Sequence, residues 1–189
     1  HIIVSSVEHP AVKNAAEWLK TQGFELDYAP VDADGFVIVS ELEKLIRDET
    51  ILISVMAVNN EVGAIQPIQE ISELLADKPT ISFHVDAVQA IGKVPLETWL
   101  TDRLDFATLS AHKFHGPRGV GIVVAKKGKR LTPLLHGGGQ EHNWRSTTEN
   151  LAGIAATSKA LRLALDEDDF KRKKVLAMKQ VILEELEKH

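Results

Sequence analysis

The sequence predicts an α/β fold in which a mainly parallel, mixed sheet is flanked by helices. Two observations lead to this expectation. First, short apolar runs alternate with amphipathic segments from His1 to Ala125. Because parallel strands need crossover connections, this alternation favours helices on both faces of a sheet. Second, several apolar runs end abruptly in polar residues, which is typical of strands whose carboxyl ends form a ligand site.

The first three elements have clear boundaries in the sequence. Residues 1–6 form a short β-rich run. A helix should follow, because Pro10 suits a first helical position and Gly23 suits a helix stop. Residues 24–29 are predicted to form the next strand, and the DADG sequence at 32–35 indicates a turn.

The next segments repeat the pattern of strand and helix. Ser40 and Glu43 are spaced as a capping box, which predicts the start of a second helix. Residues 51–58 are almost entirely apolar, as expected of a strand covered on both faces. Pro67 should begin a third helix, and residues 80–85 should form the following strand.

The last part of the sequence changes from strands to helices. Residues 105–109 and 119–125 are predicted strands, and residues 131–135 a possible further one. Beyond the HGGG sequence at 136–139 the pattern is helical, with an interruption at 166–169. Two apolar stripes mark these helices: Leu151, Ile154, Ala155, Ser158, Leu161 and Leu165, and then Val175, Met178, Ile182 and Leu186.

Composition excludes several classes of function. A length of 189 residues suits one substantial domain, and 44% hydrophobic with 26% charged residues is typical of a globular protein. A net charge of -5 argues against a nucleic-acid partner. No apolar run is long enough for a membrane span, so a cytoplasmic protein is expected. The absence of cysteine excludes disulfides, cysteine-bound zinc and thiol nucleophiles within this chain.

Polar residues follow four of the predicted strands. They are Glu8-His9, residues 59–61, residues 86–89 and residues 110–113. Because parallel strands end at the same edge of a sheet, we expect these four groups to converge.

The convergent set suits pyridoxal phosphate (PLP) better than other cofactors. Lys113 could form the Schiff base, and Asp86 could pair with the pyridinium nitrogen so that the ring acts as an electron sink. Ser110 and His112 supply hydrogen-bond donors for a phosphate. No metal is expected in this arrangement.

Five ordered segments carry a resemblance to a known family. They are VEHPAV (7–12), VNNEVGAIQPI (58–68), HVDAVQAIGK (84–93), SAHKFHGPRGVG (110–121) and HGGGQEHNWRSTTEN (136–150). The sequence resembles the central part of a NifS/IscS-type cysteine desulfurase, a class V aminotransferase-family enzyme of PLP fold type I. The resemblance implies that residues 1–150 form an incomplete PLP-binding large-domain core of a PLP-dependent transferase. Residues 151–189 would be helices leading toward a missing small domain.

The resemblance also assigns roles to individual residues. Lys113 would carry the cofactor and then shuttle protons. Asp86 would keep the ring nitrogen protonated, and Gln89 would bind the ring hydroxyl. His9 would stack on the ring and take part in catalysis. Asn60 would touch the ring and the substrate.

Three further residues are implied to bind the phosphate. Ser110 and His112 would do so within the subunit. Thr148 resembles the threonine that reaches the phosphate of the neighbouring subunit, so a homodimer is expected. Thr147 departs from the family, since most relatives carry glycine there.

The implied activity converts L-cysteine to L-alanine, with sulfur transferred as an enzyme persulfide to an iron–sulfur scaffold or a tRNA-thiolation enzyme. The resemblance implies that the first phosphate-binding segment precedes His1. It also places the sulfur-accepting cysteine and the carboxylate-binding arginine beyond His189. The fragment by itself is therefore expected to be inactive.

Other interpretations of the sequence remain open. The chain could come from another class V enzyme, such as a selenocysteine lyase or a small-amino-acid aminotransferase, or could be a non-catalytic fragment. A metal hydrolase could use His84, Asp86, His112 and His115. Locally, His9 and Thr148 could be helix caps, and Asn60 and Gln89 turn or cap residues.

Overall fold

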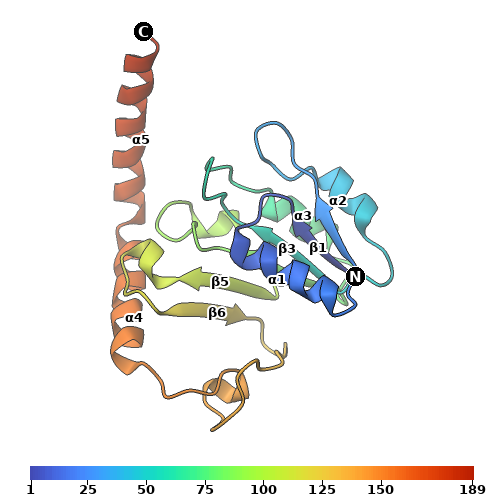
Figure 1. Ribbon diagram of the computed structural model, residues 1–189. Coiled ribbons are helices and arrows are strands. Elements are labelled where there is room, and N and C mark those ends of the chain that lie inside the picture. Colours follow the sequence, from blue (N-terminus) through green and yellow to red (C-terminus); the bar gives the residue numbers. More distant parts are fainter.

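The computed structural model describes the backbone of residues 1–189 and the side chains of residues 1–167 and 169–189. It contains a six-stranded sheet in the order β2-β1-β3-β4-β5-β6 (Figure 1). The first five strands are parallel and β6 is antiparallel to β5, so the predicted mixed α/β fold is confirmed. The strands are β1 (Ile2–Ser5), β2 (Leu26–Ala29), β3 (Leu52–Met56), β4 (Ser82–Asp86), β5 (Phe106–Ser110) and β6 (Gly121–Ala125).

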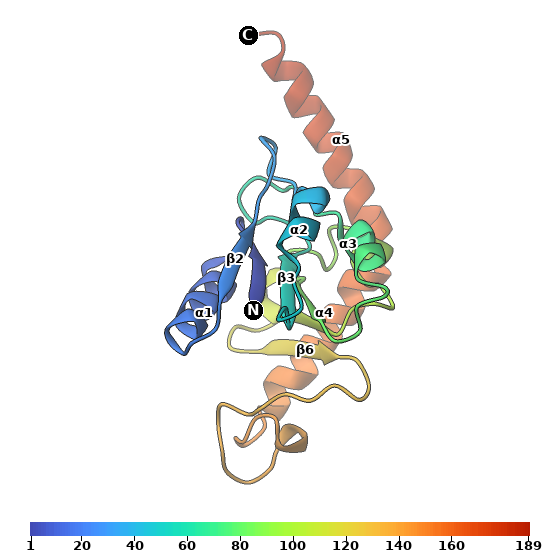
Figure 2. The same cartoon turned by 90° about the vertical axis from the view of Figure 1, so that its right-hand side faces the viewer.

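Helices cover both faces of the sheet, as the pattern of strand and helix predicts. Alternate residues of β1 serve the two sides, since Ile2 and Val4 pack with α1 (Pro10–Thr21) while Ile3 belongs to the larger core. That larger core also receives α2 (Val39–Leu45) and α3 (Ile68–Leu74). Figure 2 shows α1 on one side of the strands and α2 and α3 on the other.

Two local predictions are wrong. Ser40 and Glu43 do not form a capping box, because α2 begins at Val39 and its N-cap residue Ile38 makes no side-chain capping bond. Ser40 therefore lies inside the first turn. Residues 131–135 form no strand, and β6 is the last strand of the sheet.

The helix α4 (Leu151–Asp166) packs against the core mainly through small residues, and of its predicted apolar stripe only Leu161 packs against the core within the described residues. Gly153, Thr157 and Ala164 are buried, whereas Leu151 is 74% exposed. Gly153 allows this close approach, since a Cβ there would lie 2.8 Å from Val120 Cγ2. The packed face of α4 contacts the 3₁₀ turn η2 (Ala111–Phe114), which carries Lys113.

The helix α5 (Asp168–Leu186) extends away from the sheet (Figures 1 and 2). The four residues of its predicted stripe are all exposed: Val175, Met178, Ile182 and Leu186. No helix in the described part of the chain is both long and apolar enough to cross a membrane. Two further 3₁₀ turns are η1 (Leu96–Thr98) and η3 (Glu141–Asn143).

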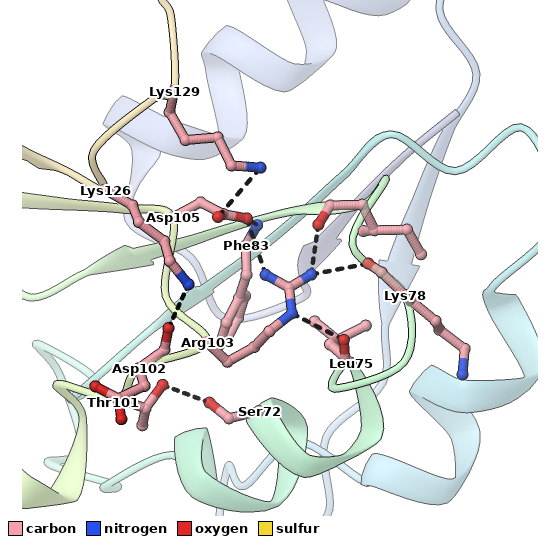
Figure 3. Close-up of polar contacts among 11 residues, drawn as sticks. Ser72, Leu75, Lys78, Phe83, Thr101, Asp102, Arg103, Asp105, Lys126 and Lys129 are labelled. Carbon is pink, nitrogen blue, oxygen red and sulfur yellow. Dashed lines mark hydrogen bonds and ion pairs between the residues drawn. The ribbon is translucent and has the colours of Figure 1, made fainter.

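A buried ion pair joins Arg103 to Asp105 at the amino-terminal edge of the sheet, opposite the ends where the predicted site residues lie (Figure 3). Arg103 donates to three backbone carbonyls, those of Leu75, Lys78 and Ile81. These bonds fix the end of α3 and the loop that leads into β4.

Candidate functional site

A cavity of about 310 Å³ opens where β3, β4 and β5 end. It brings together seven of the eight residues predicted to form the site: His9, Asn60, Asp86, Gln89, Ser110, His112 and Lys113. Four residues that the sequence did not single out complete the lining: Ala11, Met56, Val58 and Val88. The predicted convergence at one edge of the sheet is therefore present in the fold, whereas the role of each residue stays a prediction.

His9 lies at the entry to α1 and lines the cavity at the same time. It is the N-cap residue of this helix, and its Nδ1 accepts a hydrogen bond from Ala11 N at 3.1 Å. Because Nδ1 acts as an acceptor, the proton of a neutral ring must reside on Nε2. The helix-cap interpretation is thus correct, and it leaves the ring free to face the cavity.

Lys113 is positioned by the tight turn η2, which follows β5 without a gap. The turn closes through Gly116 N, which donates to Ala111 O at 2.8 Å. A side chain at Gly116 would place a Cβ 2.9 Å from the same oxygen, so only glycine fits. His115, which lies between η2 and Gly116, has a left-handed backbone with a φ of 68°. Packing of α4 against η2 supports the turn from the other side.

Asp86 is a buried carboxylate at the end of β4, with only 6% of its surface exposed. Its Oδ1 accepts one hydrogen bond from Val88 N at 3.0 Å. Burial raises the pKa of Asp86 above its usual range, and the Val88 bond and then the charge of the nearby His9 only partly oppose this. No cation among the described residues pairs with Asp86, so its ionised form would be stabilised by a cationic group in the cavity.

Lys93 does not line the cavity, but it is bonded to the cavity residue Gln89 and lies close enough to Lys113 for the two charges to interact. Gln89 Oε1 accepts from Lys93 Nζ at 2.5 Å, which leaves the Gln89 amide nitrogen as a donor. Burial, and then the positive charge of Lys113, lower the pKa of Lys93. The sequence analysis assigned no role to Lys93. Its only signal was a spacing of four residues from Gln89, and this positive potential favours an anion near Lys113.

The polar turn after β3 contains two asparagines with different positions, one buried in the turn and one in the cavity lining. Asn59 is buried and structural, since its Oδ1 accepts from Glu61 N and Val62 N and its Nδ2 donates to Val7 O at 3.1 Å. Asn60 lines the cavity. Asn60 itself lies in the turn over residues 60–62, so its turn interpretation is correct, and its predicted role toward a ligand stays a prediction.

Thr148 is the predicted residue that does not line this cavity; it is exposed in the segment before α4. The N-cap of α4 is Asn150, whose side chain accepts from Gly153 N. The helix-cap interpretation of Thr148 is therefore wrong. Its predicted role toward a second subunit stays a prediction.

The metal-site alternative has no geometric support. Within the described residues, no group of three or more His, Asp or Glu side chains is placed to hold a metal ion. His84 is instead bonded to Ser54 Oγ at 2.7 Å and Thr108 Oγ1 at 3.1 Å. Burial lowers the pKa of His84 to about 4, so this ring is a neutral bridge between three strands.

Comparisons with known proteins agree with the resemblance. The chain is 51% identical over 182 residues to a NifS/IcsS protein homolog of Lactobacillus delbrueckii subsp. bulgaricus, covering 96% of this chain and 47% of that protein. It is 46% identical over 190 residues to the cysteine desulfurase IscS of Dictyoglomus turgidum, covering 100% and 47%. The chain thus spans about half the length of these curated relatives.

Solved structures show the same relationship. A NifS-like protein superposes with a TM-score of 0.93 at 42% identity, covering 99% of this chain and 51% of that one. A structure described as SspA in complex with cysteine gives 0.79 at 35% identity, covering 86% and 47%. The family model described as "Aminotransferase class-V" matches residues 1–189. The chain therefore belongs to the class-V aminotransferase family.

Proposed function

We propose that the full-length protein carrying this chain is a PLP-dependent cysteine desulfurase. It would convert L-cysteine to L-alanine and transfer the sulfur as an enzyme persulfide. The observation that carries the proposal is the convergence in one cavity of a lysine, Lys113, and a buried carboxylate, Asp86, that forms no ion pair within the described residues. The relatives named as cysteine desulfurases, and the neighbour described with bound cysteine, support this choice of substrate.

The residues of the cavity fit PLP chemically. Lys113 Nζ offers the primary amine for covalent attachment, and Asp86 offers the carboxylate that a protonated pyridine nitrogen needs. The raised pKa of Asp86 is the expected state of a carboxyl whose cationic partner is the ligand. When bound, PLP would supply an electron sink for bonds broken at the substrate Cα and Cβ.

The remaining residues would bind and orient. The imidazole of His9 can lie against a ring, with its Nε2 proton directed away from the helix cap. The free amide donor of Gln89 suits a ring hydroxyl, and Ser110 and His112 suit a phosphate in the positive field of Lys93 and Lys113. Once released, Lys113 Nζ would hold the proton exchanged with the substrate carbon.

Three parts of the proposal lie outside the described chain. The chain contains no cysteine, so the sulfur-accepting thiolate would be supplied by another segment of the full-length protein. The exposed position of Thr148 is compatible with a homodimer in which it reaches the phosphate of the second subunit. Iron–sulfur scaffold or tRNA-thiolation proteins would take up the sulfur.

We also propose that residues 1–150 are the PLP-binding core and that residues 151–189 are the connection to a small domain.

The test combines covalent labelling and turnover in the full-length protein. Borohydride reduction with PLP should label Lys113. In a separate unreduced sample, L-cysteine with an added thiol reductant should yield alanine and sulfide in equal amounts, because the thiol reduces the enzyme persulfide. Lys113→Ala should abolish the label and lower turnover by about 10²–10⁴-fold. A label on another lysine, or turnover retained in Lys113→Ala, would contradict the proposal. Residues 1–189 alone should bind PLP weakly and release no sulfide.

A further inference from the structure

Glu8 is a buried carboxyl that directly precedes the cavity residue His9 in the chain and has no role in the proposed chemistry. It occupies the loop between β1 and α1, next to His9, and is 6% exposed. Its Oε1 accepts two hydrogen bonds, from Ser5 Oγ at 2.7 Å and from Met56 N at 2.5 Å. Its Oε2 is also buried and has no hydrogen-bond partner among the described residues.

The bonds of Glu8 tie together two loops that carry cavity residues. The bond to Met56 N attaches the His9 loop to the end of β3. A second attachment runs from Asn59 Nδ2 to Val7 O at 3.1 Å. His9 and Asn60 reach the cavity from these two loops, so their separation depends on the two bonds.

Glu8 is also close to Asp86. Met56, whose amide Glu8 accepts, is the register partner of Asp86 across β3 and β4. The negative charge of Asp86 opposes ionisation of Glu8. The two buried carboxyls therefore interact through the residue pair that ends these strands.

The surroundings of Glu8 disfavour a negative charge. Besides Asp86 on β4, the titratable groups around it are His9 at the start of α1 and the three acids that line a second cavity with it: Asp32, Asp34 and Glu61. No lysine or arginine in the described part of the chain pairs with it. Burial above all, and then Asp86, raise the pKa of Glu8 to about 8. Because Oε1 already accepts two donors, the proton of the neutral acid resides on Oε2.

We propose that Glu8 is a positioning residue that works as an uncharged acid: it fixes the His9 and Asn60 loops and leaves Asp86 as the single negative charge facing the cofactor. This inference rests on the proposed function, since it takes the cofactor to be PLP. A second charge at Glu8 would alter the balance between Asp86 and a protonated ring nitrogen. The absorbance of the bound cofactor should therefore change when Glu8 ionises.

The first experiment needs no cofactor. Infrared difference spectra of the full-length apoprotein, wild type minus Glu8→Gln, should show a protonated carboxylic acid at pH 7. This band should disappear as the pH is raised through about 8. In an Asp86→Asn background the same transition should move down by about one pH unit, because a like charge has been removed. An ionised Glu8 at pH 6, or a transition that Asp86→Asn does not move, would overturn the proposal.

The second experiment uses the PLP-loaded protein. The absorbance of bound PLP in the wild type should show a transition at the pH where the infrared band of Glu8 is lost. Glu8→Gln, which keeps a neutral side chain with an acceptor at Oε1, should lack this transition and should bind PLP at pH 7 within about tenfold of wild type. Glu61→Gln, an exposed acid at the second cavity, is the matched control and should titrate like wild type.

The outcomes separate the two proposals. Identical absorbance titrations of wild type and Glu8→Gln would show that Glu8 is merely structural. A failure of PLP to label Lys113 would overturn the proposed function, whereas the infrared experiment would still test the neutral state of Glu8.

Discussion

Two buried aspartates at opposite edges of the sheet behave in opposite ways. Asp105, before β5, is 3% exposed, and Asp86, at the end of β4, is 6% exposed. Asp105 accepts from Phe83 N and pairs with Arg103 at 2.9 Å and Lys129 at 3.1 Å (Figure 3). Asp86 accepts a hydrogen bond only from Val88 N among the described residues. Equal burial of the same residue type therefore says little about its protonation.

The hydrogen-bond and ion-pair partners of the two aspartates explain why their pKa values shift in opposite directions. Burial opposes ionisation of Asp105, but the bonds from Phe83 N, Arg103 and Lys129 together outweigh it and hold its pKa below the usual range. For Asp86 burial dominates, and its pKa is raised. A carboxylate with a full set of protein partners stabilises the fold, whereas one without a cation is available to a ligand.

The largest expected effect on stability comes from removing an ion-pair partner of Asp105. Arg103→Ala should destabilise the full-length protein by about 3–5 kcal/mol, because it removes one of the two cations paired with the buried Asp105 and leaves three carbonyls without their donor. Urea unfolding measures the change. Arg162→Ala removes an exposed ion pair with Asp166 and should cost less than about 1 kcal/mol. Equal losses in the two variants would show that the buried pair has no special weight.

Substitution of Asp86, in contrast, should lower activity rather than stability. Asp86→Asn should lower desulfurase turnover by about 10²-fold or more, and far more than Gln89→Ala, because the carboxylate charge is lost from the ring nitrogen. Its stability at neutral pH should stay the same or rise, since a buried carboxyl with a raised pKa loses stability as pH increases. Turnover assays and urea unfolding of each variant give both quantities, and a large destabilisation would contradict the comparison.

The smallest net effect concerns pH, because two buried groups act in opposite directions over much of their range. Glu8, with its pKa raised from 4.5 to about 8, contributes stability below pH 4.5 that is lost as pH rises through this window. His84, lowered from 6.5 to about 4, contributes stability above pH 6.5 that is lost on acidification. Each contributes up to about 1.4 kcal/mol per pH unit, so the two slopes cancel where the windows overlap.

Single variants should separate these slopes. Glu8→Gln should remove most of the decline between pH 6.5 and 8, where of these two groups only Glu8 acts. His84→Gln should leave that decline intact and remove the opposing slope at lower pH. The check is the free energy of unfolding at several pH values, and a decline that survives in Glu8→Gln would assign it to another group.

The cavity was predictable because its residues lie at the ends of recognisable strands. Asp86 and Lys113 follow apolar runs, and parallel strands must end at one edge. Local capping was less predictable, as Ser40 shows: its spacing to Glu43 matched a capping box, but α2 begins one residue before Ser40, at Val39. Thr148 and Asn150 both had suitable side chains for a cap, and only the position of α4 selected Asn150.

The groups around the cavity could not be identified from spacing alone. The role of Lys93 depends on its contacts with Gln89 and Lys113. The role of Glu8 depends on Met56 and Asp86, which lie on other strands. An isolated Glu or Lys in a sequence is most often a solvated surface charge. No local pattern marks a glutamate that becomes buried, as Glu8 does, or a lysine whose charge acts on a second lysine, as that of Lys93 does.

The sequence by itself determined the α/β fold and the positions of Lys113 and Asp86, because apolar periodicity and strand-end polarity are local properties of a chain. The tertiary structure decided which carboxyls are paired. Asp105 receives Lys129 because β6 returns antiparallel to β5, while neither Asp86 nor Glu8 forms an ion pair within the described residues. Ionisation depends on burial and on partners that are distant in sequence, so only the folded chain separates the structural aspartate from the candidate catalytic one.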